Sequence, residues 1–211
     1  MTLLLGDHAP DFVSDSTEGV IAFHDYLGDS WGVLFSHPQD FTPVCTTELG
    51  EVARLIGEFE RRNTKVLGVS VDPVATHRDW CSDVRDVTGH SLNFPLLGDP
   101  DRIIASLYGM IHPFADNSLT VRSVVVVSPR KTVALMMNYP MSTGRDFTEI
   151  LRALDSLQLA AKYPVATPAN WRPGDDVLVA PTVSDADAAA RFPRGYRAVK
   201  NYLRYTPQPG L

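Results

Sequence analysis

Short apolar segments alternate with amphipathic helical segments along this chain, and the alternation limits its fold more than any other feature. Val33–His37 predicts a buried strand that ends at Pro38, and Thr46 to about Arg62 predicts a helix with apolar side chains three and four residues apart. Lys65–Val71 predicts a second strand, and a second helix is expected from Val74 to Val84 or a little beyond. This order is typical of a sheet covered by helices.

The next part of the chain adds shorter elements of the same kinds. A short helix is expected from Arg102 to Tyr108, after an apolar segment at Phe94–Leu97. Ser123–Ser128 and Thr132–Tyr139 flank a short turn and predict a hairpin, and Phe147–Tyr163 predicts a long amphipathic helix. We therefore expect an α/β fold with a mixed central sheet flanked by helices.

The charge balance excludes two classes of partner. The chain has 19 basic and 25 acidic residues, a net charge of −6 and no basic run, which argues against a nucleic-acid or anionic-membrane surface.

Apolar runs such as Val124–Val127 are far shorter than the roughly 20 residues that a membrane span needs. No secretory signal is visible, so a cytoplasmic protein is expected.

The two cysteines differ in their surroundings. Cys81 lies inside the second predicted helix, where a small buried side chain is its expected role. Cys45 stands between a strand and a helix, so it should lie in the first helical turn, where unpaired N–H groups and the helix dipole stabilise a thiolate. Neither the cysteines nor the six histidines show metal-ligand spacing, so we expect no metal and no cofactor.

The residues before Cys45 support a shaped loop around its sulfur. Thr42 can direct its hydroxyl toward the sulfur or toward a bound oxygen, and Pro38 and Pro43 restrict the loop backbone. On these residues alone, a nucleophilic cysteine and an ordinary buried cysteine remain equally open. A thiolate that cleaves a peroxide also needs fixed donors, and the guanidinium of Arg122 could supply them. The position of Arg122 at a strand boundary, taken alone, favours a solvated charge.

Several motifs resemble one known family. Pro38-x-x-x-Thr42-x-x-Cys45 resembles the PxxxTxxC signature of the peroxiredoxins, which is highly specific, and Gly6-Asp7-x-x-Pro10-Asp11-Phe12 is similar to their N-terminal strand entry. Residues 28–32 and 41–48 resemble the one-cysteine branch, the peroxiredoxin-six type. Pro168-x-Asn170-Trp171-x-Pro173-Gly174-Asp175 resembles the C-terminal domain of that branch. The resemblance runs from about residue 6 to the end of the chain.

The resemblance implies a thioredoxin-like scaffold and a thiol-dependent peroxidase that reduces hydrogen peroxide and organic hydroperoxides. Cys45 would be the peroxidatic cysteine, which is oxidised to a sulfenic acid and can be over-oxidised. Pro38 would shield it, Thr42 would bind the peroxide oxygens, and Arg122, which matches the family's active-site arginine, would favour the thiolate and steady the transition state.

Three further residues receive supporting roles from the resemblance. Glu48 would pair with Arg122 and aim it. His37 would be a near neighbour able to hydrogen-bond the peroxide or Cys45, although an ordinary histidine at a strand end is nearly as well supported. Arg145 matches a second family arginine near the pocket, with a charge at a helix start as the equal alternative.

The resemblance also implies partners. Because no cysteine follows Cys81, the resolving position of two-cysteine relatives is empty, and an external thiol or thiol protein is the expected reductant. The usual dimer of the family pairs edge strands, and Thr132–Tyr139 is the candidate strand for a homodimer, from which higher oligomers could assemble.

The sequence leaves two alternatives to the peroxidase. Gly28-Asp29-Ser30-Trp31-Gly32 fits the GxSxG pattern of serine lipases, but it precedes a predicted strand, and Arg130 stands where relatives with a Ser30–His24 pair have a carboxylate. A structural turn is therefore preferred. The non-enzyme alternative is a peroxide sensor or chaperone-like binding protein that uses Cys45 as a redox switch. Thr42 and Arg122 favour repeated catalysis over this alternative.

Prolines are far denser after Tyr163 than before it. We expect a peroxidase domain at residues 1–163 and a small, turn-rich C-terminal domain at residues 164–211 with little core of its own. Its aromatic side chains are of the kind enriched where chains meet, so we expect the domain to pack at the dimer interface and partly cover the Cys45 pocket. These side chains are Trp171, Phe192, Tyr196, Tyr202 and Tyr205.

Overall fold

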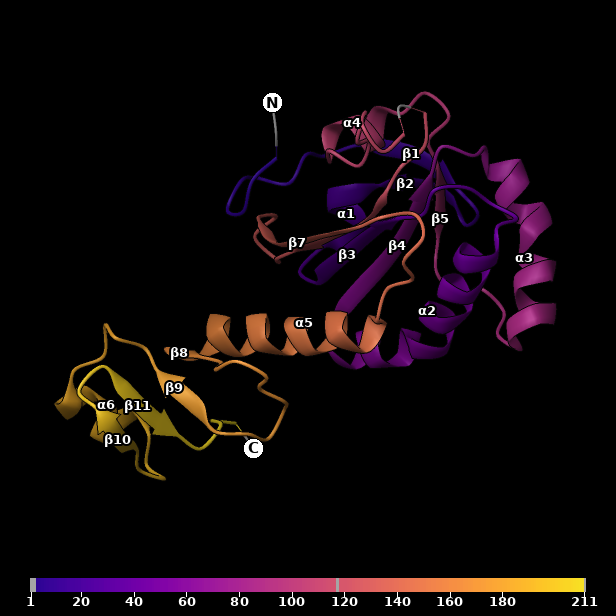
Figure 1. Cartoon of the computed structure of the whole chain (residues 1–211). Coiled ribbons are helices and arrows are strands. Elements are labelled where there is room, and N and C mark those ends of the chain that lie inside the picture. The colour runs from indigo at the N-terminus through magenta and orange to yellow at the C-terminus, as the bar shows by residue number, and fades with distance from the viewer. Residues whose placement is uncertain (1–2, 117, 211) are drawn as a thin grey trace. The chain divides into compact units, whose positions relative to one another are not determined.

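A seven-stranded mixed sheet organises the first part of the chain in the computed structural model, which describes residues 3–116 and 118–210 (Figure 1). Within these residues the strand order is β2-β1-β5-β4-β3-β6-β7. The strands are β1 (Val13–Ser16), β2 (Gly19–Ala22), β3 (Trp31–Ser36), β4 (Thr64–Ser70), β5 (Leu96–Gly98), β6 (Arg122–Val127) and β7 (Val133–Tyr139). The mixed α/β sheet expected from the sequence is confirmed.

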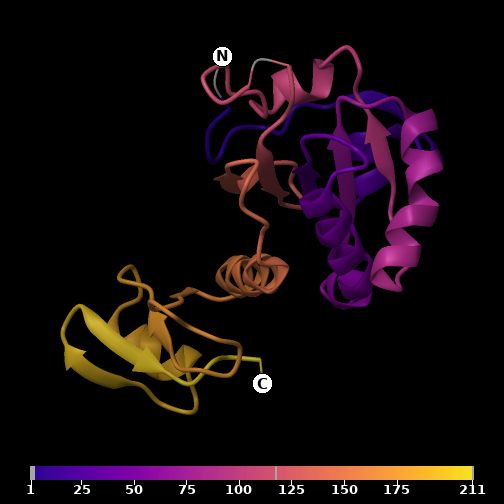
Figure 2. The same ribbon diagram turned by 45° about the vertical axis from the view of Figure 1, so that its right-hand side comes forward.

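Two long helices connect the parallel strands at the centre of the sheet. β3, β4 and β5 run parallel, so each connection crosses over through a helix, α2 (Pro43–Arg61) and then α3 (Val74–Thr88). The two helices lie side by side in both views (Figures 1 and 2). They approach closely at Gly50, where an added Cβ would stand 2.4 Å from the Cβ of Thr88.

Two short helices, α1 (Phe23–Leu27) and α4 (Ile103–Leu107), contribute to the core of one sheet face. Alternate strand residues, which point to the same side of a pleated sheet, supply the rest of that core. The buried cluster joins aromatic side chains such as Phe23 and Tyr108 to strand residues that include Leu34, Leu67 and Val125. The β1–β2 hairpin and α1 were not expected, because both strands have only four residues and β1 contains a single apolar side chain, Val13.

α2 begins three residues before the predicted start at Thr46. Thr42 is its N-cap and Pro43 occupies the first helical position, where a proline lacks only an N–H that would be unpaired anyway. Cys45 is therefore the third residue of the helix, in the first turn as expected.

The chain divides into two compact units between Phe147 and Thr148. The boundary that we expect at residues 163 and 164 falls at the end of α5 (Phe147–Lys162), inside the second unit, and it stays a prediction about domains. None of the helices in the described ranges is both long and apolar enough to cross a membrane.

The second unit contains its own sheet, in the order β10-β11-β9-β8. Its further elements are β8 (Val165–Ala166), β9 (Val177–Val179), α6 (Asp185–Arg191), β10 (Arg197–Lys200) and β11 (Leu203–Thr206). Trp171 and Phe192 are buried in a cluster of this unit together with valines of the short strands. The expectation of little internal core was wrong, because the prolines set turns between short strands and do not prevent those strands from burying side chains.

Candidate active site

Strand register brings three distant parts of the chain to one place. β6 runs antiparallel to β3, with Val124 opposite Phe35, so the first residue of β6, Arg122, lies beside the end of β3. The same end of β3 leads through a short loop into α2 and Cys45. After β7 the chain returns and supplies Arg145. The sheet thus brings together Cys45, Arg122 and Arg145, three of the residues proposed for the site.

Cys45 is completely buried, and within the described part of the chain its sulfur accepts a hydrogen bond from Arg122. Nη1 of Arg122 lies 3.3 Å from Sγ of Cys45, and the residue has 0% exposed surface. Two further bonds, from Nε and Nη2 of Arg122 to the carbonyl oxygen of Met141 at 2.8 and 2.6 Å, fix the guanidinium plane. Arg122 is thus a buried, oriented cation rather than a solvated charge.

Glu48 joins the two arginines into one buried ion cluster. Its Oε2 accepts from Nη1 of Arg122 at 2.8 Å and from Nη2 of Arg145 at 2.7 Å, and its Oε1 accepts from the backbone N and Nε of Arg145. Nη1 of Arg145 also donates to the carbonyls of Ser36 and Ser123. The side chains of all three charged residues are at most 3% exposed.

The charges of this cluster do not balance without the sulfur. Two guanidinium groups face one carboxylate, which leaves one positive charge in a buried site where an uncompensated charge is costly. A thiolate on Cys45, already in contact with Arg122, would restore neutrality. Together with the first-turn position of Cys45, this arrangement favours the nucleophilic form of the cysteine.

The pKa of Glu48 predicts how stability depends on pH. Burial raises the pKa of this carboxyl, but the bonds from Arg145 and the charge of Arg122 outweigh burial, so the pKa is lowered. A depressed carboxyl pKa stabilises the fold above its unfolded value of about 4.3, and this contribution is lost as pH falls through the folded pKa.

Glu48→Gln should therefore lower the free energy of unfolding near neutral pH by about 3 kcal/mol or more, because it removes the only carboxylate in the described cluster that balances the two buried guanidinium groups. The acid-side loss of stability should also become shallower in this variant. Urea unfolding at several pH values would measure both effects. Glu51→Gln is the matched control, since Glu51 lies on the same helix with an exposed Arg54 partner. Equal pH profiles for wild type and Glu48→Gln would contradict the prediction.

The loop before α2 places the other predicted residues. Pro38 is buried, and the hydroxyl of Thr42 donates to the carbonyl of Gln39 at 2.8 Å, which leaves its oxygen able to accept. Phe41 has a positive φ of 54° and is 53% exposed, an uncommon conformation for a bulky residue. The contacts of Pro38 and Thr42 with a peroxide stay predictions.

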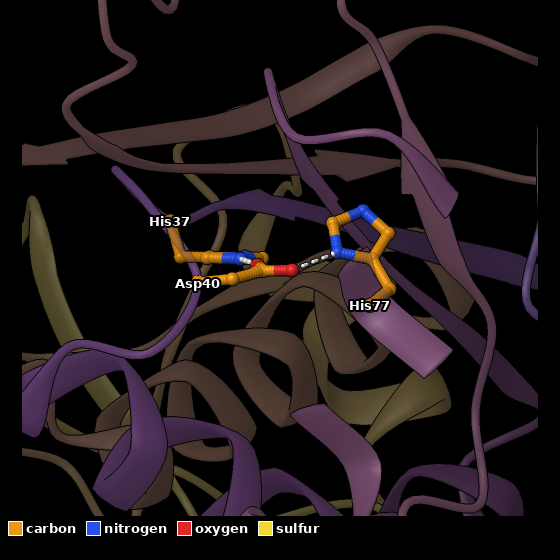
Figure 3. Close-up of side chains that lie close together, drawn as sticks. All are labelled: His37, Asp40 and His77. Carbon is orange, nitrogen blue, oxygen red and sulfur yellow. Dashed lines mark hydrogen bonds and ion pairs between the residues drawn. The ribbon is translucent and has the colours of Figure 1, made fainter. Parts of the chain in front are cut away.

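His37 lies in a second buried group, next to the ion cluster along β3. Its Nε2 is 2.7 Å from Oδ1 of Asp40, and Oδ2 of the same carboxylate is 2.6 Å from Nδ1 of His77 on α3 (Figure 3). Sequence reasoning missed Asp40 and His77, because only the β3-α2-β4-α3 crossover brings position 77 beside positions 37 and 40. Nothing in their spacing could have signalled this contact.

These three residues are also the described group that could hold a metal. Their ligand atoms all lie within 4.8 Å of one another. Zinc with ligand bonds of about 2.0–2.2 Å in tetrahedral geometry needs its ligand atoms more than about 3 Å apart, so an ion would have to push these atoms apart. The distances of 2.6 and 2.7 Å are those of hydrogen bonds between a carboxylate and imidazole N–H groups.

The lipase-like residues do not meet. The hydroxyl of Ser30 donates to Asn63, and Nε2 of His24 contacts the carbonyl of Ala9 at 2.9 Å, while Arg130 is exposed. β3 begins after Ser30, so the motif lacks the strand-before-serine order of a nucleophile elbow.

Cys81 lies within α3 and donates to the carbonyl of His77, and burial and the charge of Asp40 raise its pKa.

Comparison with protein families gives two matches. The model of the AhpC/TSA family matches residues 5–136, and that of the C-terminal domain of 1-Cys peroxiredoxin matches residues 156–195. A 1-Cys peroxiredoxin of Dictyostelium discoideum is 54% identical over 207 residues, covering 98% of this chain and 86% of the relative. Peroxiredoxin-6 of Gallus gallus is 50% identical, with 98% of each chain covered.

Solved structures are similar over the same length. A cysteine-to-serine mutant of the peroxiredoxin 6 of Arenicola marina superposes with a TM-score of 0.93 at 47% identity, covering 99% of this chain and all of the other. A yeast mitochondrial 1-Cys peroxiredoxin, studied for thiol resolution via glutathione and thioredoxin systems, gives a TM-score of 0.92 at 46% identity, covering 98% of this chain and all of the other.

Proposed function

We propose that Cys45 carries the thiol-dependent peroxidase activity of this chain, which belongs to the AhpC/TSA family and to its one-cysteine peroxiredoxin branch. The observation that carries the proposal is the contact between Sγ of Cys45 and Nη1 of Arg122 inside a cluster whose charges a thiolate would balance. The peroxidase activity itself follows from the family, and the assignment of its residues is our proposal.

In the proposed reaction, the Cys45 thiolate attacks the terminal oxygen of a hydroperoxide. The S–O bond forms as the O–O bond breaks, the sulfur is oxidised to a sulfenic acid, and the released alkoxide or hydroxide takes up a proton. Arg122 stabilises the charge that moves onto the leaving oxygen, and Glu48 and Arg145 hold Arg122 in place. Thr42 and His37 provide acceptors for the peroxide, and Pro38 covers the sulfur.

We propose that an external thiol reduces the sulfenic acid. Cys81 is poorly suited to resolve it, because it lies within a helix, its thiol is bonded to the His77 carbonyl, and its pKa is raised. The yeast mitochondrial relative is described with glutathione and thioredoxin systems, and we extend that class of reductant to this chain. Both cysteines are free, consistent with a reducing compartment such as the cytoplasm.

The reductant can be identified by steady-state peroxide consumption. We expect turnover with a monothiol such as glutathione or with a thioredoxin system, and none with ascorbate, because the sulfenic acid is resolved through a mixed disulfide. Peroxide loss over many turnovers would be measured for the wild type and for Cys81→Ser. A single stoichiometric oxidation that no thiol reverses would favour the alternative, a peroxide sensor.

We also propose a homodimer formed through β7. This strand is an edge of the seven-stranded sheet, with mostly apolar, half-buried residues at Val133–Tyr139. Apart from Val133, whose backbone is bonded to Gly6 and Asp7, such an edge offers unpaired backbone groups to a second copy. Hydroperoxides and thiol reductants are the other proposed partners, and the acidic net charge of −6 supports neither a nucleic acid nor a membrane surface.

A further inference from the structure

The hydrogen-bonded side chains of His37, Asp40 and His77, called the buried triad below, hold one more proton than two neutral imidazoles would supply. Nδ1 of His77 is 2.6 Å from Oδ2 of Asp40, and Nε2 of His77 is 3.0 Å from the carbonyl oxygen of Leu97. Both partner atoms are acceptors, whereas a neutral imidazole carries a single N–H. The contact between His77 and Asp40 must therefore contain a second proton, on Nδ1 or on Oδ2.

The charge of Asp40 decides where this proton lies. Burial raises the pKa of Asp40, but the hydrogen bonds from His37 and His77 outweigh burial and lower it. Asp40 is thus ionised, and the additional proton belongs to His77, which becomes the positive partner of a buried ion pair. The histidine side chains are 0% exposed and that of Asp40 is 1% exposed, so water does not share this charge.

His37, on the other side of Asp40 in the buried triad, is in the opposite protonation state. Its Nε2 donates to Oδ1 of Asp40, and its Nδ1 is buried without a hydrogen-bond partner in the described residues. Burial is the main cause that lowers the pKa of His37, and the positive charge of His77 adds to it, while the bond to Asp40 opposes both. His37 is therefore neutral, with its proton on Nε2 and a bare Nδ1.

We propose that His77 and Asp40 are positioning residues: His77 carries the proton that balances Asp40, and His37 thereby remains a neutral acceptor at the end of β3. The inference rests on the proposed function, in which His37 serves the hydroperoxide. A bare Nδ1 can accept a hydrogen bond from the O–H of the hydroperoxide while the Cys45 thiolate attacks. An imidazolium carries a proton on both nitrogens and could not accept this bond.

The other groups around His37 also bear on its pKa. Asp72, in the loop before α3, accepts from the backbone N of Asp40 and raises the pKa of His37. The ring of Trp80 packs 5.5 Å from that of His37 and carries no charge. Arg145 donates to the carbonyl of Ser36, the residue before His37, and so connects the buried triad to the ion cluster. Among the groups that act on His37, His77 is thus the one that offsets the two carboxylates.

Two substitutions separate charge from hydrogen bonding. His77→Gln can still donate to Leu97 or Asp40 but cannot carry the additional proton, so the charge of Asp40 should draw a proton onto His37. Asp40→Asn removes the charge and keeps the contacts. Because Leu97 fixes the His77 proton on Nε2, the amide N–H of the substituted side chain donates to Nδ1 of His77, and its carbonyl accepts from His37. The double variant lacks both charges.

Nitrogen-15 NMR of histidine-labelled protein would read each ring directly, with His37 identified by loss of its signal in His37→Asn. In the wild type at about pH 7, His77 should show two protonated nitrogens and His37 only Nε2–H. His77→Gln should raise the titration midpoint of His37 by about one pH unit or more. Asp40→Asn and the double variant should not raise it.

The pH dependence of the rate of Cys45 oxidation should change in the same variants that change the protonation of His37. The ratio of the rate at about pH 6 to that at about pH 8 should fall in His77→Gln and recover in the double variant. A singly protonated His77 in the wild type would overturn the inference without any variant. So would an unmoved His37 midpoint in His77→Gln, or zinc binding with loss of the hydrogen-bonded N–H signals. Failure of the proposed function is separate, because it would appear as peroxidase activity retained by Cys45→Ser.

Discussion

Cys45→Ser is expected to reduce peroxide consumption to the level of a protein-free blank, whereas Cys81→Ser should retain most of it. The sulfur of Cys45 contacts Arg122 in a buried cluster with an excess positive charge, and a serine hydroxyl remains protonated there and is a far weaker nucleophile. Cys81 lies in α3, with its thiol bonded to a backbone carbonyl and its pKa raised.

Peroxide loss with dithiothreitol as reductant would measure both variants, and mass spectrometry after one equivalent of peroxide would locate the oxygen added to sulfur. Thermal unfolding of Cys45→Ser serves as the control, since a folded but inactive variant isolates the chemical role of the thiol. Similar losses of activity in the two variants would mean that Cys81 resolves the intermediate, and the one-cysteine assignment would then be wrong.

Arg122→Ala is expected to slow the reaction of Cys45 with peroxide by at least about 10²-fold, the scale on which an enzyme loses rate when one oxyanion donor is removed. The guanidinium contacts both Cys45 and Glu48, and Met141 fixes its plane. Its loss removes the donor nearest to the sulfur and lowers the fraction of thiolate at a given pH. Stopped-flow oxidation would give the rate, and thiolate absorbance against pH would give that fraction.

Arg122→Lys is the informative comparison. Lysine keeps the charge but cannot present the planar fork that donates to Cys45, Glu48 and Met141 together. The lysine variant should therefore restore thiolate more fully than it restores rate. Wild-type rates in Arg122→Ala would show that another cation, such as Arg145, serves the pocket.

The sequence predicts the central site well because its signals are local. Cys45 stands between an apolar strand and an amphipathic helix, so its place in the first helical turn could be predicted, although the helix begins at Pro43 and not at Thr46. The turn after Ser123–Ser128 likewise placed Arg122 next to a strand of a hairpin, and it is the first residue of that strand. The family resemblance then supplies the pairing of Glu48 with Arg122, which the 2.8 Å contact reproduces. The roles of these side chains toward a peroxide remain predictions.

Features that depend on long-range contact could not be predicted in this way. Asp40 and His77 meet only after the second crossover helix is packed, so their relation has no sequence period. The internal core of the second unit was missed for another reason: proline density reports on turns, while burial of Trp171 depends on how short strands pair across those turns.

The absence of exposed surface on Cys45 has a kinetic consequence. A hydroperoxide can reach this sulfur only when the atoms that cover it move, so we expect each turnover to pass through a less populated, open state. The observed rate constant is then the intrinsic rate multiplied by the population of that open state. Substitutions far from the reacting atoms can therefore speed or slow oxidation by changing this population alone. Small and bulky hydroperoxides will report different values of it, because each needs an opening of its own width.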